Sequence, residues 1–267
     1  MFYKIDPKNR EVKIIGKTIA IANQKGGVAK TTTAVNLGAW LSLMGQKILL
    51  VDIDPQGNAT TGVGVDKNGL QCCIYDLLIN GLNVRDVIVS SALENLDLIP
   101  ATIELAGAEV ELVNMAGRES VLKNALKEIR EEYDYIFIDC PPSLGLLTIN
   151  ALTAADSVII PIQCEYYALE GLSQLMNTIK MVQQRLNKQL SLEGVLLTMF
   201  DGRTNLAIQV VDEVKKYFKE KVYRTIVPRN VRLSEAPSHG KPVMVYDRRS
   251  RGAEAYRELA EEVMGVG

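Results

Sequence analysis

The chain has 267 residues, of which 47% are hydrophobic and 23% are charged, and its formal net charge is −2. Length and apolar content are enough for one large α/β domain, and the near-neutral balance argues against a protein that binds polyanions by bulk charge. No apolar run is long enough to span a bilayer, and four cysteines without a C-x-x-C pair and a single histidine fit neither a disulfide framework nor a histidine-based metal site.

Residues 1–16 predict a short N-terminal arm, with a strand at 12–15. The arm is mixed and polar and has no apolar core of the kind found in a signal peptide, so we expect a cytoplasmic protein. It is also too short for a separate DNA-reading domain. Residues 17–267 are expected to form a single domain.

The first landmark is a strand, a glycine turn and a helix in direct succession. Residues 18–23 (TIAIAN) form a short apolar run, and apolar residues recur at helical spacing over 34–44 (AVNLGAWLSLM). Between them stands QKGGVAKTTT. Glycines at such a point let backbone N–H groups surround an anion, and the start of the helix adds a partial positive charge. This order predicts a phosphate-binding loop; the alternative is an ordinary glycine-rich turn.

The loop departs from the usual G-x-x-x-x-G-K-[ST] pattern. Gln24 and Ala29 stand where that pattern has glycines, and Lys25 adds a lysine at the head of the loop. Lys30 can reach the outer phosphates of a nucleotide, and the hydroxyl of Thr31 can hold Mg²⁺. The run K-G-G-V-A-K-T is a deviant Walker A motif, and it resembles that of the ParA/MinD branch of P-loop ATPases.

A second apolar run, residues 47–53 (KILLVDI), suits a strand buried on both faces of a parallel sheet. Asp52 and Asp54 follow at its carboxyl end, where α/β sheets bind ligands. Asp54 is therefore a candidate for orienting an attacking water. The alternative is a turn former, because aspartate before proline is common in turns.

Strands and helices alternate along the rest of the chain. After a loop and short helices over 59–95, strands are predicted at 96–100, 133–139, 157–161, 192–200 and 223–227, and helices at 104–112, 119–132, 171–186, 205–220 and 251–264. Such alternation implies right-handed crossovers. We therefore predict an α/β fold: a single-domain P-loop NTPase with a mostly parallel, twisted sheet flanked by helices on both faces.

The strand predicted at 133–139 (YDYIFID) is apolar and ends in Asp139, followed by the rigid turn CPPS. This is the pattern of a Walker B strand, in which Asp139 would support Mg²⁺ through water. The alternative is an ordinary core strand with an exposed end.

Charge is unevenly spread along the chain. Residues 201–257 hold 13 Lys and Arg against 7 Asp and Glu, a local net charge of +6, so the remainder carries −8. This asymmetry indicates a basic face in the C-terminal part. The alternative is a solvated surface, the usual place for helical lysines.

Five sequence blocks together resemble the Soj/ParA chromosome-partitioning ATPases, over nearly the whole chain from Thr18. They are KGGVAKTT, LLVDIDPQGN, YDYIFIDCPPS, NALTAADSVIIPIQCEYYALEGL and PRNVRLSEAPSHGKP. Two other classes stay open. One is a MinD-like membrane-cycling regulator of cell division, against which the acidic C-terminal helix argues. The other is a metabolic P-loop enzyme, for which the sequence names no acceptor pocket.

The resemblance implies ATP and Mg²⁺ as ligands and a set of residues that hold them. Nucleotide contacts are expected from Lys25, Gly26, Gly27, Val28, Ala29, Lys30, Thr31 and Thr32, and, around adenine, from Pro228 and Asn230. Metal support is expected from Thr31, Asp54 and Asp139. Catalytic roles fall to Lys25, which would reach a partner's nucleotide, to Lys30 and to Asp54.

The resemblance also implies an ATP-dependent homodimer with slow basal hydrolysis, accelerated by a ParB-like protein. Such a dimer would bind double-stranded DNA without reading sequence and would be found on the nucleoid. Arg203 and Arg232 match arginines that the family uses for DNA, and Lys215, Lys219 and Lys241 extend the basic face. Ala29 departs from the glycine of most relatives. Its methyl group costs little if its φ is negative and more if it is positive, and we expect ATP to bind in either case.

Overall fold

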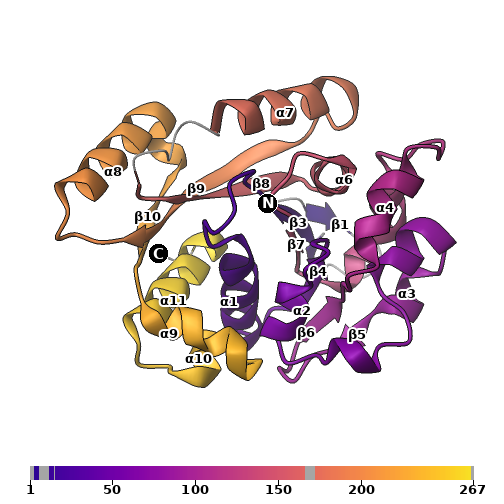
Figure 1. Cartoon of the computed structure of the whole chain (residues 1–267), viewed down its shortest axis with the longest axis horizontal. Helices are drawn as coiled ribbons and strands as arrows, with labels where there is room; N and C mark the ends of the chain where they lie inside the picture. The colour runs from indigo at the N-terminus through magenta and orange to yellow at the C-terminus, as the bar shows by residue number, and fades with distance from the viewer. Residues whose placement is uncertain (1–2, 6–11, 15, 166–171, 266–267) are drawn as a thin grey trace.

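The computed structural model describes residues 3–5, 12–14, 16–165 and 172–265. Ile15 and Gly171, at the edges of two predicted elements, lie outside these ranges. An eight-stranded sheet runs through the described chain in the order β10-β9-β8-β3-β7-β4-β6-β5 (Figure 1). Its strands are β3 (Lys17–Ile21), β4 (Ile48–Asp52), β5 (Val89–Ser90), β6 (Leu96–Ile99), β7 (Tyr135–Asp139), β8 (Ser157–Gln163), β9 (Ser191–Phe200) and β10 (Val222–Pro228).

Neighbouring strands of this sheet are parallel, except that β5 pairs with β6 in the antiparallel sense. The predicted mostly parallel α/β sheet is therefore confirmed. A separate antiparallel pair joins β1 (Tyr3–Ile5) to β2 (Val12–Ile14), which confirms most of the strand predicted at 12–15. The boundary between an arm of residues 1–16 and a domain of residues 17–267 stays a prediction.

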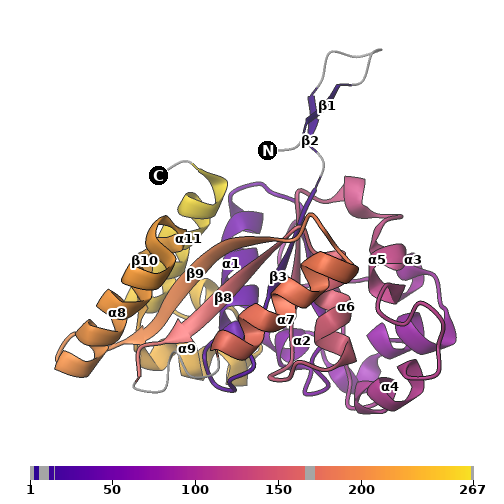
Figure 2. The same ribbon diagram turned by 90° about the horizontal axis from the view of Figure 1, so that it is seen from above.

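Helices cover both faces of the sheet (Figure 2). One face packs on α1 (Lys30–Leu43), α9 (Val231–Glu235), α10 (Val243–Tyr246) and α11 (Arg251–Met264), and the other on α4 (Leu105–Leu112), α5 (Val121–Leu126), α6 (Leu146–Ala154), α7 (Leu172–Arg185) and α8 (Asn205–Phe218). Short elements are α2 (Asn58–Gly62), α3 (Val84–Val87), the 3₁₀ turns Lys67–Gly69, Arg130–Glu132, Lys219–Lys221 and Ala236–His239, and the π turn Asp76–Asn80.

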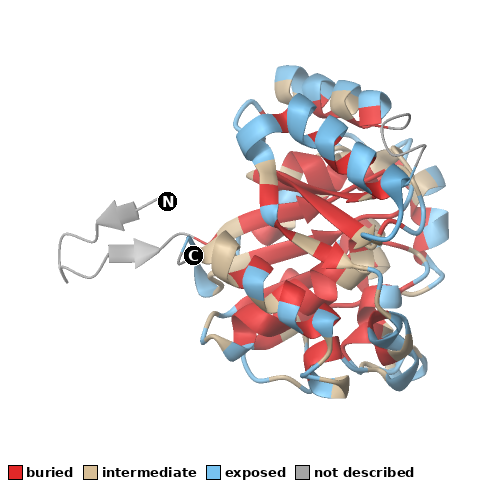
Figure 3. Cartoon of the chain, turned by 90° about the vertical axis from the view of Figure 1, so that its left-hand side faces the viewer, coloured by how far each residue is buried: buried red, intermediate tan, exposed pale blue. Residues whose placement is uncertain are grey.

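Alternate side chains of the central strand β3 serve the two layers. Ile19 and Ile21 belong to the apolar cluster with α1 and α11, whereas Ala20 and Ala22 belong to the cluster on the other face, as the two-residue period of a strand requires. The sheet is consequently buried throughout its centre (Figure 3). Helix α1 is buried almost all round because it lies between the sheet and α11.

The prediction of a helix over residues 119–132 is wrong for the second half of that range. Helix α5 ends at Leu126, and a 3₁₀ turn follows at Arg130–Glu132. The chain tightens there through i→i+3 bonds, such as Ile129 N to the Leu126 carbonyl oxygen at 3.2 Å, before it enters β7. Helices α6, α9 and α10 and strand β5 were not predicted.

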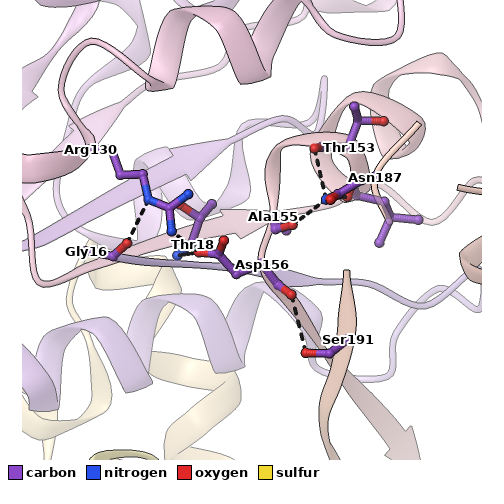
Figure 4. Close-up of polar contacts among 9 residues, drawn as sticks. Gly16, Thr18, Arg130, Thr153, Ala155, Asp156, Asn187 and Ser191 are labelled. Carbon is purple, nitrogen blue, oxygen red and sulfur yellow. Dashed lines mark hydrogen bonds and ion pairs between the residues drawn. The ribbon is translucent and has the colours of Figure 1, made fainter. Parts of the chain in front are cut away.

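An ion pair fixes the amino-terminal end of the sheet, opposite the predicted phosphate loop (Figure 4). Arg130 donates from Nε to the Gly16 carbonyl oxygen at 3.0 Å and from Nη2 to Asp156 Oδ2 at 2.5 Å. The same Asp156 oxygen accepts from the Thr18 backbone N–H at 2.9 Å. Gly16 must be glycine, since a Cβ there would fall 2.1 Å from the Tyr133 carbonyl oxygen.

Asn187 closes the carboxyl end of α6 beside this ion pair (Figure 4). It is buried, and its Nδ2 lies 2.7 Å from the carbonyl oxygen of Ala155 and 3.1 Å from that of Thr153. These are carbonyl groups that a helix end leaves without partners. The base of the sheet is thus rigidly connected, so the loops at its other end start from fixed positions.

Candidate nucleotide-binding site

The loop between β3 and α1 is held from below by buried polar side chains. Asn23 donates from Nδ2 to the Pro161 carbonyl oxygen at 2.8 Å, and its Oδ1 accepts from the Lys25 backbone N–H at 3.0 Å. Thr198, fully buried at the end of β9, donates to the Val28 carbonyl oxygen at 3.1 Å. Sequence reasoning missed both supports. An asparagine directly after a buried strand was the available signal for Asn23.

Lys30, the first residue of α1, turns back across the loop. It is only 6% exposed, and its Nζ donates to the Lys25 carbonyl oxygen at 3.1 Å. Burial lowers the pKa of Lys30, while the electrostatic effect of its acidic neighbours, chiefly Asp139, acts in the opposite direction. An ammonium group is therefore held inside the loop with carboxylates beside it, which is where the outer phosphates of a nucleotide need positive charge.

Ala29 adopts the left-handed backbone conformation, with φ 71° and ψ 31°. Because its φ is positive, the methyl group of Ala29 strains the backbone, which is the more costly of the two possibilities that the sequence left open. Its carbonyl oxygen accepts from both the backbone N–H and the Oγ1 of Thr33, at 2.9 and 2.7 Å. Thr33 Oγ1 in turn lies 3.1 Å from the hydroxyl of Tyr256, a fully buried residue of α11. Helix α11 thus helps to hold the strained residue.

Two carboxylates lie side by side where the central strands end. Asp139 on β7 is the register partner of Asp52 on β4 and of Ile21 on β3. Burial, and then the charge of Asp52, raises the pKa of Asp139 well above its ordinary value. Neither of its oxygens has a hydrogen-bond partner of standard geometry among the described residues.

Asp52, by contrast, has its hydrogen-bonding capacity filled within the protein. Its Oδ2 accepts from both the backbone N–H and the Oγ1 of Thr60 at 2.8 Å, and its Oδ1 accepts from the Asp54 backbone N–H at 3.2 Å. Burial nevertheless raises the pKa of Asp52 to about 6. Asp52 therefore anchors the turn that carries Asp54, a role that its position in the sequence did not reveal.

The orphaned carboxylate of Asp139 fits a hard cation such as Mg²⁺, which takes oxygen ligands. The Thr31 hydroxyl acts on Asp139 from the first turn of α1 and lowers its pKa, against the effect of burial. Asp54 is 7% exposed and accepts from the Gln56 backbone N–H at 2.9 Å. The three predicted metal residues are thus gathered at one edge of the sheet, near Lys30.

Lys25 lies on the rim rather than inside the loop. Its side chain is 36% exposed, and Nζ lies 3.9 Å from Glu165 Oε2. Glu165 also faces Arg229, whose Nη2 is 3.3 Å from Oε1. At such distances and exposure, these pairs contribute little to stability. The charge of Lys25 is therefore free to act on a group outside its own chain.

Pro228 and Asn230, the two residues predicted to contact adenine, lie at the end of β10 and just after it. Strand β10 pairs with β9, which carries Thr198, the residue that supports the phosphate loop. Pro228 is the register partner of Phe200. Asn230 caps α9, because its Oδ1 accepts from the Arg232 backbone N–H at 2.9 Å. Capping of α9 is therefore sufficient to explain why residue 230 is an asparagine. Contact of Asn230 with adenine stays a prediction.

Of the predicted DNA residues, Arg203 lies just before α8, Lys215 on it and Lys219 just after it, near the β10 edge of the sheet (Figure 1). Arg232 lies on α9. Lys241 lies in the turn before α10 and shares a small pocket with Thr31 and Thr32 at the start of α1. Arg203 is bound to Asp201, with Nε–Oδ1 and Nη2–Oδ2 distances of 2.8 and 2.6 Å, and this contact lowers the pKa of Asp201 to about 2. Arg232 contacts Glu235 and Asp247 at 2.8 and 3.3 Å. Both arginines are exposed, so a phosphate competes only with weak surface pairs.

The three predicted lysines on this side differ from the arginines. Lys215, Lys219 and Lys241 are exposed, and no ion pair engages them among the described residues. Lys215 and Lys219 lie at the end of α8, whereas Arg203 precedes its first turn. The helix axis separates the two groups by about 20 Å, which makes the basic face an extended surface rather than one pocket.

Comparison with known proteins decides the family. The model of a family described as an AAA domain matches residues 16–192. Over 253 residues the chain is 66% identical to the sporulation initiation inhibitor protein Soj of Bacillus subtilis, covering 95% of this chain and all of that protein. The chain belongs to the ParA/Soj family of partitioning ATPases.

A second ParA/Soj relative is the chromosome partitioning protein ParA of Myxococcus xanthus, 57% identical over 250 residues, covering 94% of this chain and 88% of that protein. Among solved structures, a cobyrinic acid a,c-diamide synthase from Mycobacterium smegmatis with a bound ATP analogue and magnesium is 41% identical. It has a TM-score of 0.83 and covers 94% of this chain and 95% of that one. The ParA/Soj fold seen here is thus one that holds an adenine nucleotide and magnesium elsewhere.

Replacing Ala29 with glycine should relieve the backbone strain in the loop. We expect Ala29→Gly to raise the free energy of unfolding by about 1 kcal/mol, because glycine accepts the left-handed conformation that alanine resists. Nucleotide binding should persist in both proteins. Urea denaturation and nucleotide titration measure the two effects. A loop that binds nucleotide only as the glycine variant would contradict this account.

Asp139→Asn should stabilise the protein that lacks nucleotide and metal. Folding raises the pKa of Asp139 above the ordinary 3.8. The carboxyl group of Asp139 therefore contributes most to the free energy of unfolding below pH 3.8, where it is protonated in both states, and this contribution is lost as the pH rises through the folded-state pKa. At pH 7 we expect the variant to gain about 1–3 kcal/mol.

The fall in stability between pH 4 and pH 7 should also be shallower in Asp139→Asn. Urea denaturation at each pH measures this, with the exposed Asp212→Asn as control, expected within about 0.5 kcal/mol of wild type. An Asp139→Asn protein that is less stable than wild type at pH 7 would show that the carboxylate has partners, contrary to the geometry.

Proposed function

We propose that this chain hydrolyses ATP to ADP and phosphate and works as a partitioning switch. In this proposal the ATP-bound form dimerises and binds double-stranded DNA without sequence preference. It is released when a ParB-like protein accelerates hydrolysis. The proposal is carried mainly by one observation, the buried and unpartnered carboxylate of Asp139 beside a loop that encloses the ammonium of Lys30. The relatives named as Soj and ParA support it.

Within one chain, binding falls to the phosphate loop. The backbone N–H groups of Gly26, Gly27, Val28 and Ala29 and the start of α1 would hold the phosphates, with Lys30 beside the outer ones. Thr31 and Asp139 would hold Mg²⁺, with Asp54 close by. When bound, the metal neutralises phosphate charge. Phosphoryl transfer needs such positioning and neutralisation more than it needs covalent help.

Asp54 is the residue that would orient the attacking water. Its Oδ1 already accepts from the Gln56 backbone N–H, and its carbonyl oxygen accepts from the Gly57 backbone N–H at 2.8 Å. These bonds fix the direction of the carboxylate, and its second oxygen has no hydrogen-bond partner among the described residues. A positioned acceptor close to the phosphate loop suits this task.

Completion of the site requires a second copy. Among the described residues, no arginine is found to contact the phosphate loop from inside, whereas Lys25 stands on its rim with a weak partner. In a dimer that faces loop to loop, Lys25 of each chain would supply positive charge to the phosphates bound by the other. Hydrolysis by the isolated chain should accordingly be slow.

Dimerisation would also double the basic face. Arg203, Arg232 and the lysines of α8 would contact DNA phosphates, and each added contact steepens the salt dependence of binding by about 0.9 in a log–log plot. ATP would thereby control DNA affinity through the oligomeric state. No predicted contact reads base edges, so binding would be indifferent to sequence. We propose a place on the nucleoid for the dimer.

A membrane-cycling role of the MinD kind is less well supported. No helix in the described residues is long and apolar enough to cross a bilayer. The apolar side of α11, with Tyr256 and Leu259, is buried against α1. That side is therefore not available to a lipid surface.

DNA affinity in ATP and in ADP tests the proposal. We expect wild type to bind random-sequence duplex in ATP with Mg²⁺, and Arg203→Ala/Arg232→Ala to bind about tenfold more weakly with a salt slope reduced by about 1 to 2 per chain. Fluorescence anisotropy over a salt series measures both quantities.

Arg85→Ala serves as the matched control, because Arg85 is likewise exposed and paired, with Glu132, but lies outside the basic segment. Its affinity should equal that of wild type. If Arg203→Ala/Arg232→Ala bound DNA as tightly as wild type, this surface would not be the DNA-binding surface. Binding to anionic vesicles but not to DNA would favour the membrane-cycling alternative.

A further inference from the structure

A groove of about 630 Å³ opens beside the turn that carries Asp54. Its lining includes Pro55 and Gln56, which directly follow Asp54, residues 102–104, which directly precede α4, and Asp76. The phosphate loop does not line the groove, so nucleotide binding does not account for it.

Two hydrogen bonds connect this groove to the Asp54 carboxylate. Lys67, on the groove wall, donates from Nζ to the Gln56 carbonyl oxygen at 2.7 Å. The Gln56 backbone N–H donates to Asp54 Oδ1 at 2.9 Å. Whatever displaces Lys67 or moves Gln56 therefore changes the position of the group proposed to orient water.

An apolar stripe leads away from the groove along α4. Ile103, Val110 and Val113 are 68%, 73% and 51% exposed. Val110 belongs to α4, Val113 follows its last residue and Ile103 lies in the turn before it. Leu105 and Leu112 of the same helix are buried in the core. Large apolar side chains exposed close together along one short segment are typical of an interaction surface.

The surroundings of groove and stripe carry more acidic than basic residues. Asp76 and Glu104 line the groove together with Lys67. Residues 67–118 hold seven Asp and Glu against Lys67, Arg85 and Arg118, a local net charge of −4, and the two arginines are paired with Glu132 and Glu119. Glu104, where the stripe meets the groove, is exposed, and no hydrogen bond or ion pair engages its side chain among the described residues. A partner here needs positive charge together with apolar side chains.

We propose that this groove and stripe dock a basic, amphipathic segment of the partner that stimulates hydrolysis. A second copy of this chain fits poorly, because a two-fold contact centred on the patch would bring two segments of net charge −4 together. The stripe also covers one short segment, which is small beside the area that a stable dimer buries. DNA is excluded by its sign of charge.

Docking at this surface acts on hydrolysis through the turn. A lysine or arginine of the partner that enters the groove meets Glu104 and competes with Lys67 for the Gln56 carbonyl oxygen. Release of that bond lets the residues after Asp54 shift and changes the hold of Gln56 on the carboxylate. The inference rests on the proposed function, since it locates the stimulating partner of the same ATPase.

Charge reversal at Glu104 tests the docking site. The probes are the ParB-like protein of the proposed function and a fluorescent peptide that spans a basic, amphipathic segment of it. Affinity is measured by anisotropy, and stimulation by phosphate release from the full chain. We expect Glu104→Lys to weaken both by at least about tenfold, and Val110→Ser, which keeps the charge, to weaken peptide binding several-fold.

Glu94→Lys is the matched control, because it makes the same charge change at an exposed position of the same acidic segment, away from the groove. It should stay within about twofold of wild type, since only local charge governs docking. Basal hydrolysis and ATP-dependent dimerisation should be unchanged in Glu104→Lys and Glu94→Lys.

Three outcomes would overturn the inference, and they are distinguishable. If the ParB-like protein stimulated Glu104→Lys and Glu94→Lys equally, docking at the groove would be refuted, and the proposed function would still stand. Loss of ATP-dependent dimerisation in Glu104→Lys would assign the surface to a second copy. No stimulation of wild type by the ParB-like protein would refute that part of the proposed function, and this docking site with it.

Discussion

The buried charge at the end of β7 is the constraint on which the rest of the site depends. Asp139 is fully buried, its oxygens have no hydrogen-bond partner of standard geometry in the described residues, and it lies beside a second buried carboxylate, that of Asp52. An uncompensated buried charge is costly, so it persists where function requires it. Lys30 offsets part of the cost from within the phosphate loop. A metal-bound nucleotide would offset the remainder, which makes the ligand a structural component of the site.

The phosphate loop is held by groups far away in the sequence. Thr198 supports Val28 from β9, and Tyr256 reaches Thr33, and through it Ala29, from the C-terminal helix. A left-handed alanine persists because its surroundings determine it. The whole length of the chain therefore contributes to one short loop, and this explains why α11 is packed into the core rather than left on the surface.

The sequence was sufficient for the strands that carry the site and for the edge of the sheet at which the site lies, although it did not reveal β5. Continuous apolar runs ending in acids identified β4 and β7 with Asp52, Asp54 and Asp139, because a strand buried on both faces leaves few other patterns. The loop's glycines and lysines identified the phosphate-binding region in the same way. The positions of β4, β7 and the phosphate loop depend on short stretches of neighbouring residues, so the sequence pattern of each stretch is enough to find them.

What the sequence could not supply depends on tertiary contacts. The φ of Ala29 is fixed by Thr33 and Tyr256 rather than by its neighbours in the chain, and the early end of α5 depends on where the chain must turn toward β7. Asp52 and Asp54 look alike in the sequence. Only the bonds from Thr60 show that the first is an anchor, whereas the second keeps a free carboxylate oxygen.

The central claim is that the site is completed by Lys25 of a second chain. Light scattering in saturating ATP and Mg²⁺ measures it most directly, on an Asp54→Ala variant in which the proposed function predicts that hydrolysis is blocked. The account predicts twice the 29.4 kDa mass of one chain, and a return toward the single mass when Lys25→Ala is added. A mass of one chain for Asp54→Ala under these conditions would contradict the account.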